Sequence, residues 1–194
     1  MTKISSLCVY CGSRMPADDD FSNAAKTLGH QLGENKIQLV YGGGHVGLMG
    51  ITADATLEAG GEVIGIIPGH LHDIEVSHEN LTELHVVDSM HTRKQMMFER
   101  SDAFVVLPGG IGTLDETFEM ITWRQLRLHD KPIILVNYKE YWQPFIDLMH
   151  HMIKQGFVEP AVFTYFEVVE GLEEILPALQ RSPDAEIQPD ISKM

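Results

Sequence analysis

Short runs of continuously apolar residues alternate along this chain with longer stretches of helical pattern. Such runs are too short for helices and lack polar alternation, which is typical of strands buried on both faces of a parallel sheet. The predicted strands are Ile4–Tyr10, Ile37–Tyr41, Val63–Ile67, Leu84–Val87, Ala103–Leu107, Ile133–Val136 and Phe166–Val169. The rhythm predicts an α/β fold of three layers, an open parallel sheet with helices on both faces.

The helical stretches lie between the strands. They cover about 20–34, 48–59, 90–100, 114–128, 141–155 and 171–180. With 194 residues the chain suits a single domain, which we expect over residues 1–181, followed by a loose polar tail at 182–194. In open parallel sheets the ligand lies at the carboxyl ends of the strands, so the loops that follow strands are the places to search.

The charge balance narrows the class of partner. Lys and Arg number 14 and Asp and Glu 28, a formal net charge of −14, which argues against a nucleic-acid binder. No apolar run is long enough to span a membrane, and we expect a cytoplasmic protein. Cys8 and Cys11 form a C-x-x-C pair, but on a strand they would point to opposite faces, so we expect neither a redox nor a zinc role.

The first two strand-end loops both contain glycine. Gly12 and Ser13 follow the first predicted strand, where a small residue and a hydroxyl suit contact with a phosphate or a base, although an ordinary turn would look the same. The second loop, residues 41–50, holds five glycines, including Gly43 and Gly44, which lets backbone N–H groups approach a ligand. The acidic residue of a dinucleotide site is missing, because the next strand ends Ile66-Ile67-Pro68. This loop therefore predicts nucleotide contact but not NAD, and a role in packing alone is the alternative.

Two adjacent cations, Arg93 and Lys94, stand near the start of the helix predicted after the fourth strand. Cations there oppose the helix dipole, so an anion is expected to compensate them. Arg93 could fork two hydrogen bonds onto a phosphate or carboxylate, whereas Lys94 acts as a point charge; a solvated basic pair is the alternative.

The stretch PGGIGTLDE, Pro108 to Glu116, combines two features of opposite kind, a site for an anion and two anionic residues. Its glycine turn and helix start suit an anion, yet Asp115 and Glu116 follow at once. On local grounds Thr113 reads as a helix N-cap and Glu116 as its capping-box partner, which would explain both residues without any function.

A chemical reading resolves the conflict. Cleavage of an N-glycosidic bond makes the sugar oxocarbenium-like, and a carboxylate can stabilise that charge or activate water. The glycine turn would then hold the 5′-phosphate, while a carboxylate one turn further meets the charge of the transition state.

The motifs jointly resemble those of the "Lonely guy" family, phosphoribohydrolases often mislabelled as lysine decarboxylases. MHTRKQMM is followed by PGGIGTLDE, close to the family's P-G-G-x-G-T-x-x-E with an upstream Arg-Lys pair, and VYCGS, VYGGG, GLMG and ITWRQL extend the similarity over about residues 4–175. The lysine-decarboxylase label is not favoured, because pyridoxal-phosphate chemistry needs a Schiff-base lysine and no accompanying cofactor motif stands out.

The resemblance implies a Rossmann-like fold without NAD or another cofactor, and a homodimer or higher oligomer. It implies release of free base from nucleoside 5′-monophosphates, with N6-prenyl adenine nucleotides as characteristic substrates and AMP as a further one. It places catalysis on Arg93 and Glu116. The implied substrate contacts are Glu75, Met90, Lys94, Gly109, Gly110, Ile111, Gly112, Thr113 and Thr122, with Gly12, Ser13, Gly43 and Gly44 of lesser weight. Asp115, where relatives often carry a second Glu, is interpreted as a helix-start residue.

Two other readings stay open. His70, His72 and His78 lie close together in the sequence, but no carboxylate partners follow a recognisable motif, so we expect no metal. A non-catalytic carrier of a nucleotide or a phosphorylated pterin cofactor, or a module that senses nucleotides, could use the same fold; turnover would separate these from the hydrolase.

Overall fold

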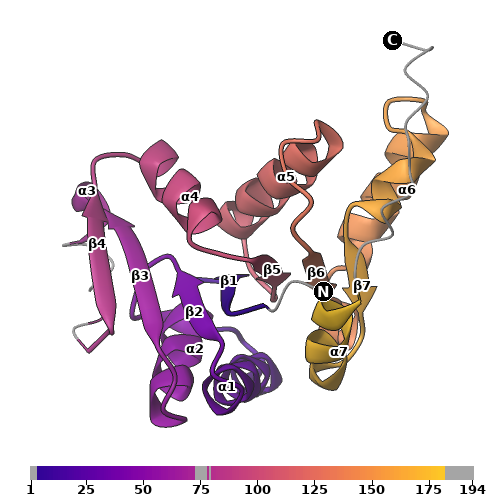
Figure 1. Cartoon of the computed structure of the whole chain (residues 1–194). Helices are drawn as coiled ribbons and strands as arrows, with labels where there is room; N and C mark the ends of the chain where they lie inside the picture. The colour runs from indigo at the N-terminus through magenta and orange to yellow at the C-terminus, as the bar shows by residue number, and fades with distance from the viewer. Residues whose placement is uncertain (1–3, 73–77, 79, 182–194) are drawn as a thin grey trace.

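One parallel sheet of seven strands runs through the computed structural model, which describes residues 4–72, 78 and 80–181 (Figure 1). The strands are β1 Ser6–Tyr10, β2 Gln38–Tyr41, β3 Val63–Pro68, β4 Glu83–Val87, β5 Ala103–Val106, β6 Ile133–Val136 and β7 Glu167–Val169. Every neighbouring pair is parallel. All seven predicted strands are confirmed, with bounds that differ by at most two residues.

Helices cover both faces of the sheet, as predicted. They are α1 Asp19–Glu34, α2 Gly47–Glu58, α3 Gly69–His72, α4 Met90–Glu99, α5 Ile111–Gln125, α6 Gln143–Lys154 and α7 Ile175–Gln180, with 3₁₀ turns at Tyr138–Glu140, Pro160–Thr164 and Leu172–Glu174. The layer of α1, α2 and α7 packs on one face, and that of α4, α5 and α6 on the other. The expected tail, residues 182–194, lies outside the described part of the chain.

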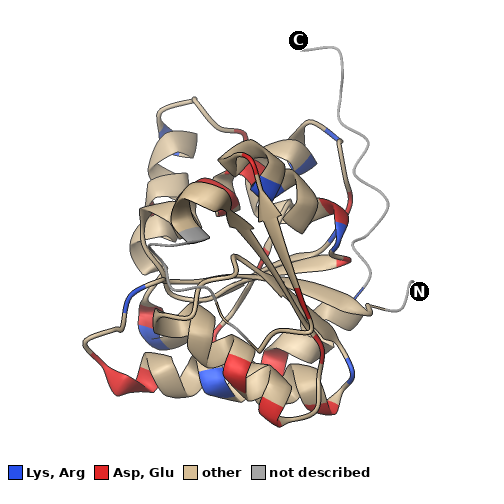
Figure 2. Cartoon of the chain, turned by 90° about the vertical axis from the view of Figure 1, so that its left-hand side faces the viewer, with Lys and Arg blue, Asp and Glu red and all other residues tan. Residues whose placement is uncertain are grey.

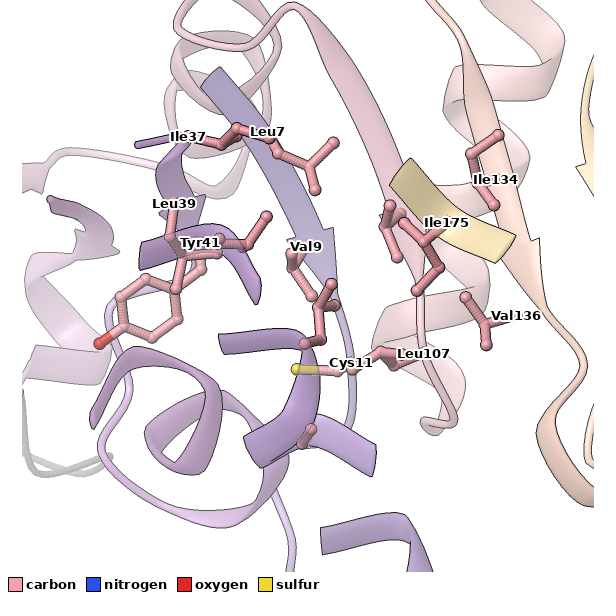
Figure 3. Close-up of a cluster of buried hydrophobic side chains, with 14 of the residues drawn as sticks. Leu7, Val9, Cys11, Ile37, Leu39, Tyr41, Leu107, Ile134, Val136 and Ile175 are labelled. Atoms are coloured by element: carbon pink, nitrogen blue, oxygen red, sulfur yellow. The ribbon is translucent and has the colours of Figure 1, made fainter. Parts of the chain in front are cut away.

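The two cores follow from the alternation of side chains along the strands. On β1, Leu7 and Val9 face α1 and α2, and Cys11 continues this side (Figure 3). Cys8 and Tyr10 face the opposite core. The prediction that the two cysteines point to opposite faces is confirmed, and both are free thiols.

The order of the strands, β4-β3-β2-β1-β5-β6-β7, reverses direction between β1 and β5. The chain leaves β1 toward β2 on one side and later returns to β5 on the other, so the sheet has a topological switch point between β1 and β5, the place where open α/β sheets bind their ligands. The loops after these two strands touch there, where the N–H of Gly12 donates to the carbonyl of Pro108 at 3.0 Å. We call this place the switch point.

Acidic positions outnumber basic ones on the ribbon, as the net charge requires (Figure 2). Among the described residues, no helix is both long enough and apolar enough to cross a membrane.

Candidate active site

The glycine turn, residues 108–110, enters α5 in a way that local rules do not predict. Helix α5 begins at Ile111, and its N-cap is Gly110, not Thr113. Thr113 is 3% exposed, and its Oγ1 would lie 2.1 Å from a Cβ placed on Gly109. The expected capping box at Thr113 is therefore wrong: Thr113 lies inside the helix and packs closely against Gly109, and the helix starts about one turn earlier, at Ile111.

This early start leaves the first turn of α5 open. Gly110 provides no side-chain cap, and the first turn contains no acidic residue. The first N–H groups of a helix have no partner within it and carry the positive end of the dipole. Such an end, at the switch point, is a ready site for an anion such as phosphate. Ile111, the first residue of the helix, is 86% exposed.

Arg93 lies almost wholly buried, 6% exposed, above the carboxyl ends of β2 and β3. Its Nε donates to the carbonyl of Ile66 at 3.1 Å and its Nη2 to that of Gly42 at 3.0 Å. A Cβ on Gly42 would lie 1.8 Å from Nη2, so any side chain at this position would displace the guanidinium from the carbonyls that it binds. Among the described residues no carboxylate forms an ion pair with Arg93. Sequence reasoning missed Gly42, whose signal was its place directly after a strand.

Glu116 lies in the second turn of α5, partly buried. Burial raises the pKa of its carboxyl to about 7; the nearby charge of Arg93 opposes this rise, and Asp115 adds to it. Desolvation thus exceeds the opposing effect of the cation. A partly buried carboxyl whose pKa lies near neutrality is suited to acid–base chemistry.

Lys94 forms a bridge between two helices. Its Nζ lies 3.1 Å from Asp115 Oδ2 and 3.2 Å from Glu119 Oε1, so α4 and α5 are joined one residue beyond Arg93 and one before Glu116. Burial disfavours the ammonium, but the hydrogen bonds to Asp115 and Glu119 outweigh it and raise the pKa of Lys94. The anion expected to compensate Lys94 is this pair of carboxylates, and Asp115 belongs to the second turn of α5, not to the helix start.

The remaining predicted contacts lie on several elements. The N–H of Gly12 donates to the glycine turn at Pro108, and Gly47, with a φ of 69°, packs the second loop so closely on the first that a Cβ would lie 2.5 Å from the nitrogen of Arg14. Gly43 adopts a φ of 77°. The other residues are Ser13, exposed in the first loop; Gly44, buried in the second; Met90, at the start of α4; and Thr122, exposed on α5. Glu75 lies outside the described residues.

The histidines are grouped differently from the sequence expectation. His78 lies with His45 and Asp54, a set of three potential metal ligands within 4.8 Å of one another. However, His78 Nδ1 accepts the N–H of Asn80 at 3.2 Å, so its Nε2 carries the hydrogen donated to Asp54 at 2.7 Å. The hydrogen bonds occupy both ring nitrogens and favour a structural pair.

Fold and site together define a Rossmann-like α/β protein that presents an open helix N-terminus and a partly buried carboxyl at its switch point. The family model described as "Possible lysine decarboxylase" matches residues 49–179. The chain belongs to this family, whose curated relatives here are cytokinin riboside 5′-monophosphate phosphoribohydrolases.

Two of these relatives illustrate the extent of the similarity. The enzyme of Rhodococcoides fascians is 43% identical over 179 residues, covering 92% of this chain and 90% of its own. One from Arabidopsis thaliana is 41% identical over 187 residues, covering 93% and 87%. A solved molybdenum cofactor carrier protein from Chlamydomonas reinhardtii shares the fold at a TM-score of 0.69 and 19% identity, over 92% of this chain and 97% of that one.

Proposed function

We propose that this protein hydrolyses the N-glycosidic bond of adenosine 5′-monophosphates, with or without an N6-prenyl group, to release free base and ribose 5-phosphate. The observation that carries this proposal is Glu116, a carboxyl with a pKa of about 7 in the turn that follows an open helix N-terminus. The names of the relatives support the reaction and the substrate class.

The 5′-phosphate is assigned to the start of α5. The N–H groups of Ile111, Gly112 and Thr113 are the donors that the helix itself leaves unpaired, and the glycine turn lets a phosphate approach them. Gly109 and Gly110 complete this turn. The ribose then extends toward the second turn of the helix, where Glu116 lies.

In the chemical step the bond between C1′ and the base nitrogen breaks, and its electron pair leaves with the base. Positive charge develops on the ribose, and ionised Glu116 stabilises it. The same carboxylate takes a proton from the water whose oxygen attacks C1′, and that proton passes to the base. The sum is one water consumed per bond cleaved.

Arg93 supports this chemistry in two ways. Its charge favours the ionised form of Glu116 against the effect of burial. Its guanidinium holds two backbone carbonyls, which leaves further N–H donors for the substrate. Lys94 acts through its bridge to Asp115 and Glu119 as well as through its charge.

The outer contacts of the nucleotide are assigned to residues of the loops after β1 and β2, of α4 and of α5, and to Glu75. They are Gly12, Ser13, Gly43, Gly44, Glu75, Met90 and Thr122. A homodimer or higher oligomer, implied by the family resemblance, and a cytoplasmic location, expected from the sequence, stay predictions; sedimentation would test the first.

The test is chromatography of AMP, and separately of N6-prenyl-AMP, after incubation with the protein and with Glu116→Gln. We expect free base from the wild type and a loss of rate of at least about 100-fold in the variant, because an amide cannot act as a base. We expect the wild-type rate to rise with pH through about 7, where Glu116 ionises. Circular dichroism verifies that both proteins are folded.

Two results would contradict the assignment. Full activity in Glu116→Gln would remove this carboxyl from the chemistry. No free base from either substrate, in folded wild-type protein, would reject the hydrolase and leave non-catalytic binding of a nucleotide or phosphorylated cofactor.

A further inference from the structure

We propose that Tyr141 is a positioning residue for the glycine turn: its hydroxyl holds the carbonyl of Gly109 and thereby directs the adjoining N–H of Gly110 toward the bound phosphate. The inference rests on the proposed function, since it needs a phosphate at the start of α5. Neither the relatives' names nor the sequence motifs point to this residue.

The contact itself is short and specific. Tyr141 Oη donates to the carbonyl oxygen of Gly109 at 2.6 Å, across 32 positions of sequence. A trans peptide is planar, and its C=O and N–H point in opposite directions. Fixing the carbonyl of Gly109 on the tyrosine therefore fixes the N–H of Gly110 on the side away from the tyrosine. The hydrogen bond sets the orientation of a group that glycine alone would leave free.

The segment that presents Tyr141, residues 137–142, is strained; we call it the β6 turn. Lys139 and Glu140 have φ values of 55° and 59°, left-handed conformations that are unfavourable for any residue with a Cβ. Asn137, 2% exposed, holds the turn together by accepting the N–H of Trp142 at 2.8 Å. Strained residues persist only where surrounding contacts hold them in place. Two of them immediately before Tyr141 therefore indicate that its backbone is held in one conformation.

The β6 turn is also fastened to α1. Lys139 Nζ lies 2.6 Å from Asp18 Oδ2 and 2.7 Å from Asp20 Oδ2. The ring of Phe21 meets that of Tyr141 edge-on, with centroids 5.5 Å apart. Tyr141 remains 39% exposed, so burial of its ring does not account for these contacts. We attribute them to the need to hold its hydroxyl against Gly109.

The experiment compares Tyr141→Phe with Tyr138→Phe. Tyr138 belongs to the same turn and also packs on Phe21, at 6.2 Å, but among the described residues its hydroxyl bonds nothing in the glycine turn. In Tyr141→Phe we expect KM for AMP and the inhibition constant of ribose 5-phosphate to rise together by about fivefold, the effect of one hydrogen bond. We expect kcat to change by less than about twofold. Tyr138→Phe is expected to leave all three unchanged.

Three outcomes would overturn the inference: an unchanged inhibition constant for ribose 5-phosphate, equal effects in both variants, or a loss of thermal stability with KM unaltered. If the wild type cleaves no AMP, calorimetric titration with ribose 5-phosphate replaces kinetics. Weaker binding by Tyr141→Phe alone would then support the positioning role while the hydrolase fails. Wild-type protein that does not bind ribose 5-phosphate would reject both.

Discussion

Helices α1 and α5 follow the neighbouring strands β1 and β5 and begin at the same edge of the sheet, yet their first turns are built in opposite ways. Asp18 caps α1 by accepting the N–H of Asp20 at 3.0 Å, and Asp19 and Asp20 add negative charge to its first turn. Helix α5 has a glycine cap without a side-chain hydrogen bond and no acidic residue in its first turn.

The difference shows how a fold reserves one helix end for a ligand. In α1 the protein satisfies the dipole with its own carboxylates, which are worth a few tenths to about 1 kcal/mol each. Helix α5 lacks this stabilisation, because its carboxylates, Asp115 and Glu116, occur one turn later. The β6 turn serves both ends, with Lys139 on the carboxylates of α1 and Tyr141 on the glycine turn of α5.

The largest expected effect comes from closing the open helix. In Gly110→Asp a carboxylate cap would occupy the phosphate site, and a Cβ at this position meets nothing within 4 Å, so the change should fit. We expect release of base from AMP to fall at least about 100-fold while thermal stability is equal or slightly higher. Gly110→Asn, which caps without charge, is the matched control and should retain more activity. An active Gly110→Asp protein would remove the phosphate from this end.

An intermediate effect concerns the carboxyl beyond the open turn. The folded-state pKa of Glu116, about 7, exceeds its ordinary value of 4.5, so the unfolded chain releases this proton first and stability falls as pH rises from 4.5 to 7. Glu116→Gln avoids this loss. We expect it to be more stable than wild type at pH 8, by about 1 to 3 kcal/mol, and equal to it at pH 4. Urea titrations at both pH values measure this, and a variant that is less stable at pH 8 would contradict the burial of the charge.

The smallest expected effect comes from removing the carboxylate cap of α1, whereas the first prediction adds such a cap to α5. Asp18→Ala removes the cap of α1 and one partner of Lys139, and should cost about 1 kcal/mol of unfolding free energy. Because Asp20 still binds Lys139, the β6 turn should stay in place and kcat/KM for AMP should hardly change. Thermal unfolding measures the loss of stability, and steady-state kinetics measure kcat/KM. A large loss of activity would mean that the two helix ends are not independent.

The sheet could be predicted because its signal is local and repeated. A strand covered on both faces must be apolar throughout, so β1, β5 and β6 are visible as unbroken apolar runs, and their carboxyl ends locate the site. The opposite orientation of Cys8 and Cys11 follows from the alternation of side chains along a strand.

The start of α5 could not be predicted, because the deciding contact is steric. Local rules rank Thr113 above Gly110 as a cap. The packing of Gly109 against Thr113 reverses that ranking, and no spacing in the sequence reveals it.

The partners of the two cations were also beyond sequence reasoning. Lys94 pairs with Asp115 and Glu119 on another helix, while Arg93 binds carbonyls that carry no residue-type signal at all. Tyr141 is 25 residues from Glu116 in the sequence and approaches the site only because β6 lies beside β5.

Because Arg93 binds backbone carbonyls, its charge is not neutralised by a partner among the described residues, and this affects how the site responds to salt. Carbonyl dipoles orient a guanidinium without cancelling its charge, whereas a carboxylate partner would have to give way each time an anionic substrate arrived. A cation that is 6% exposed is also screened by mobile ions much less than a cation on the surface. We therefore expect added salt to weaken the attraction of Arg93 for an anionic substrate less than it weakens that of a surface lysine or arginine.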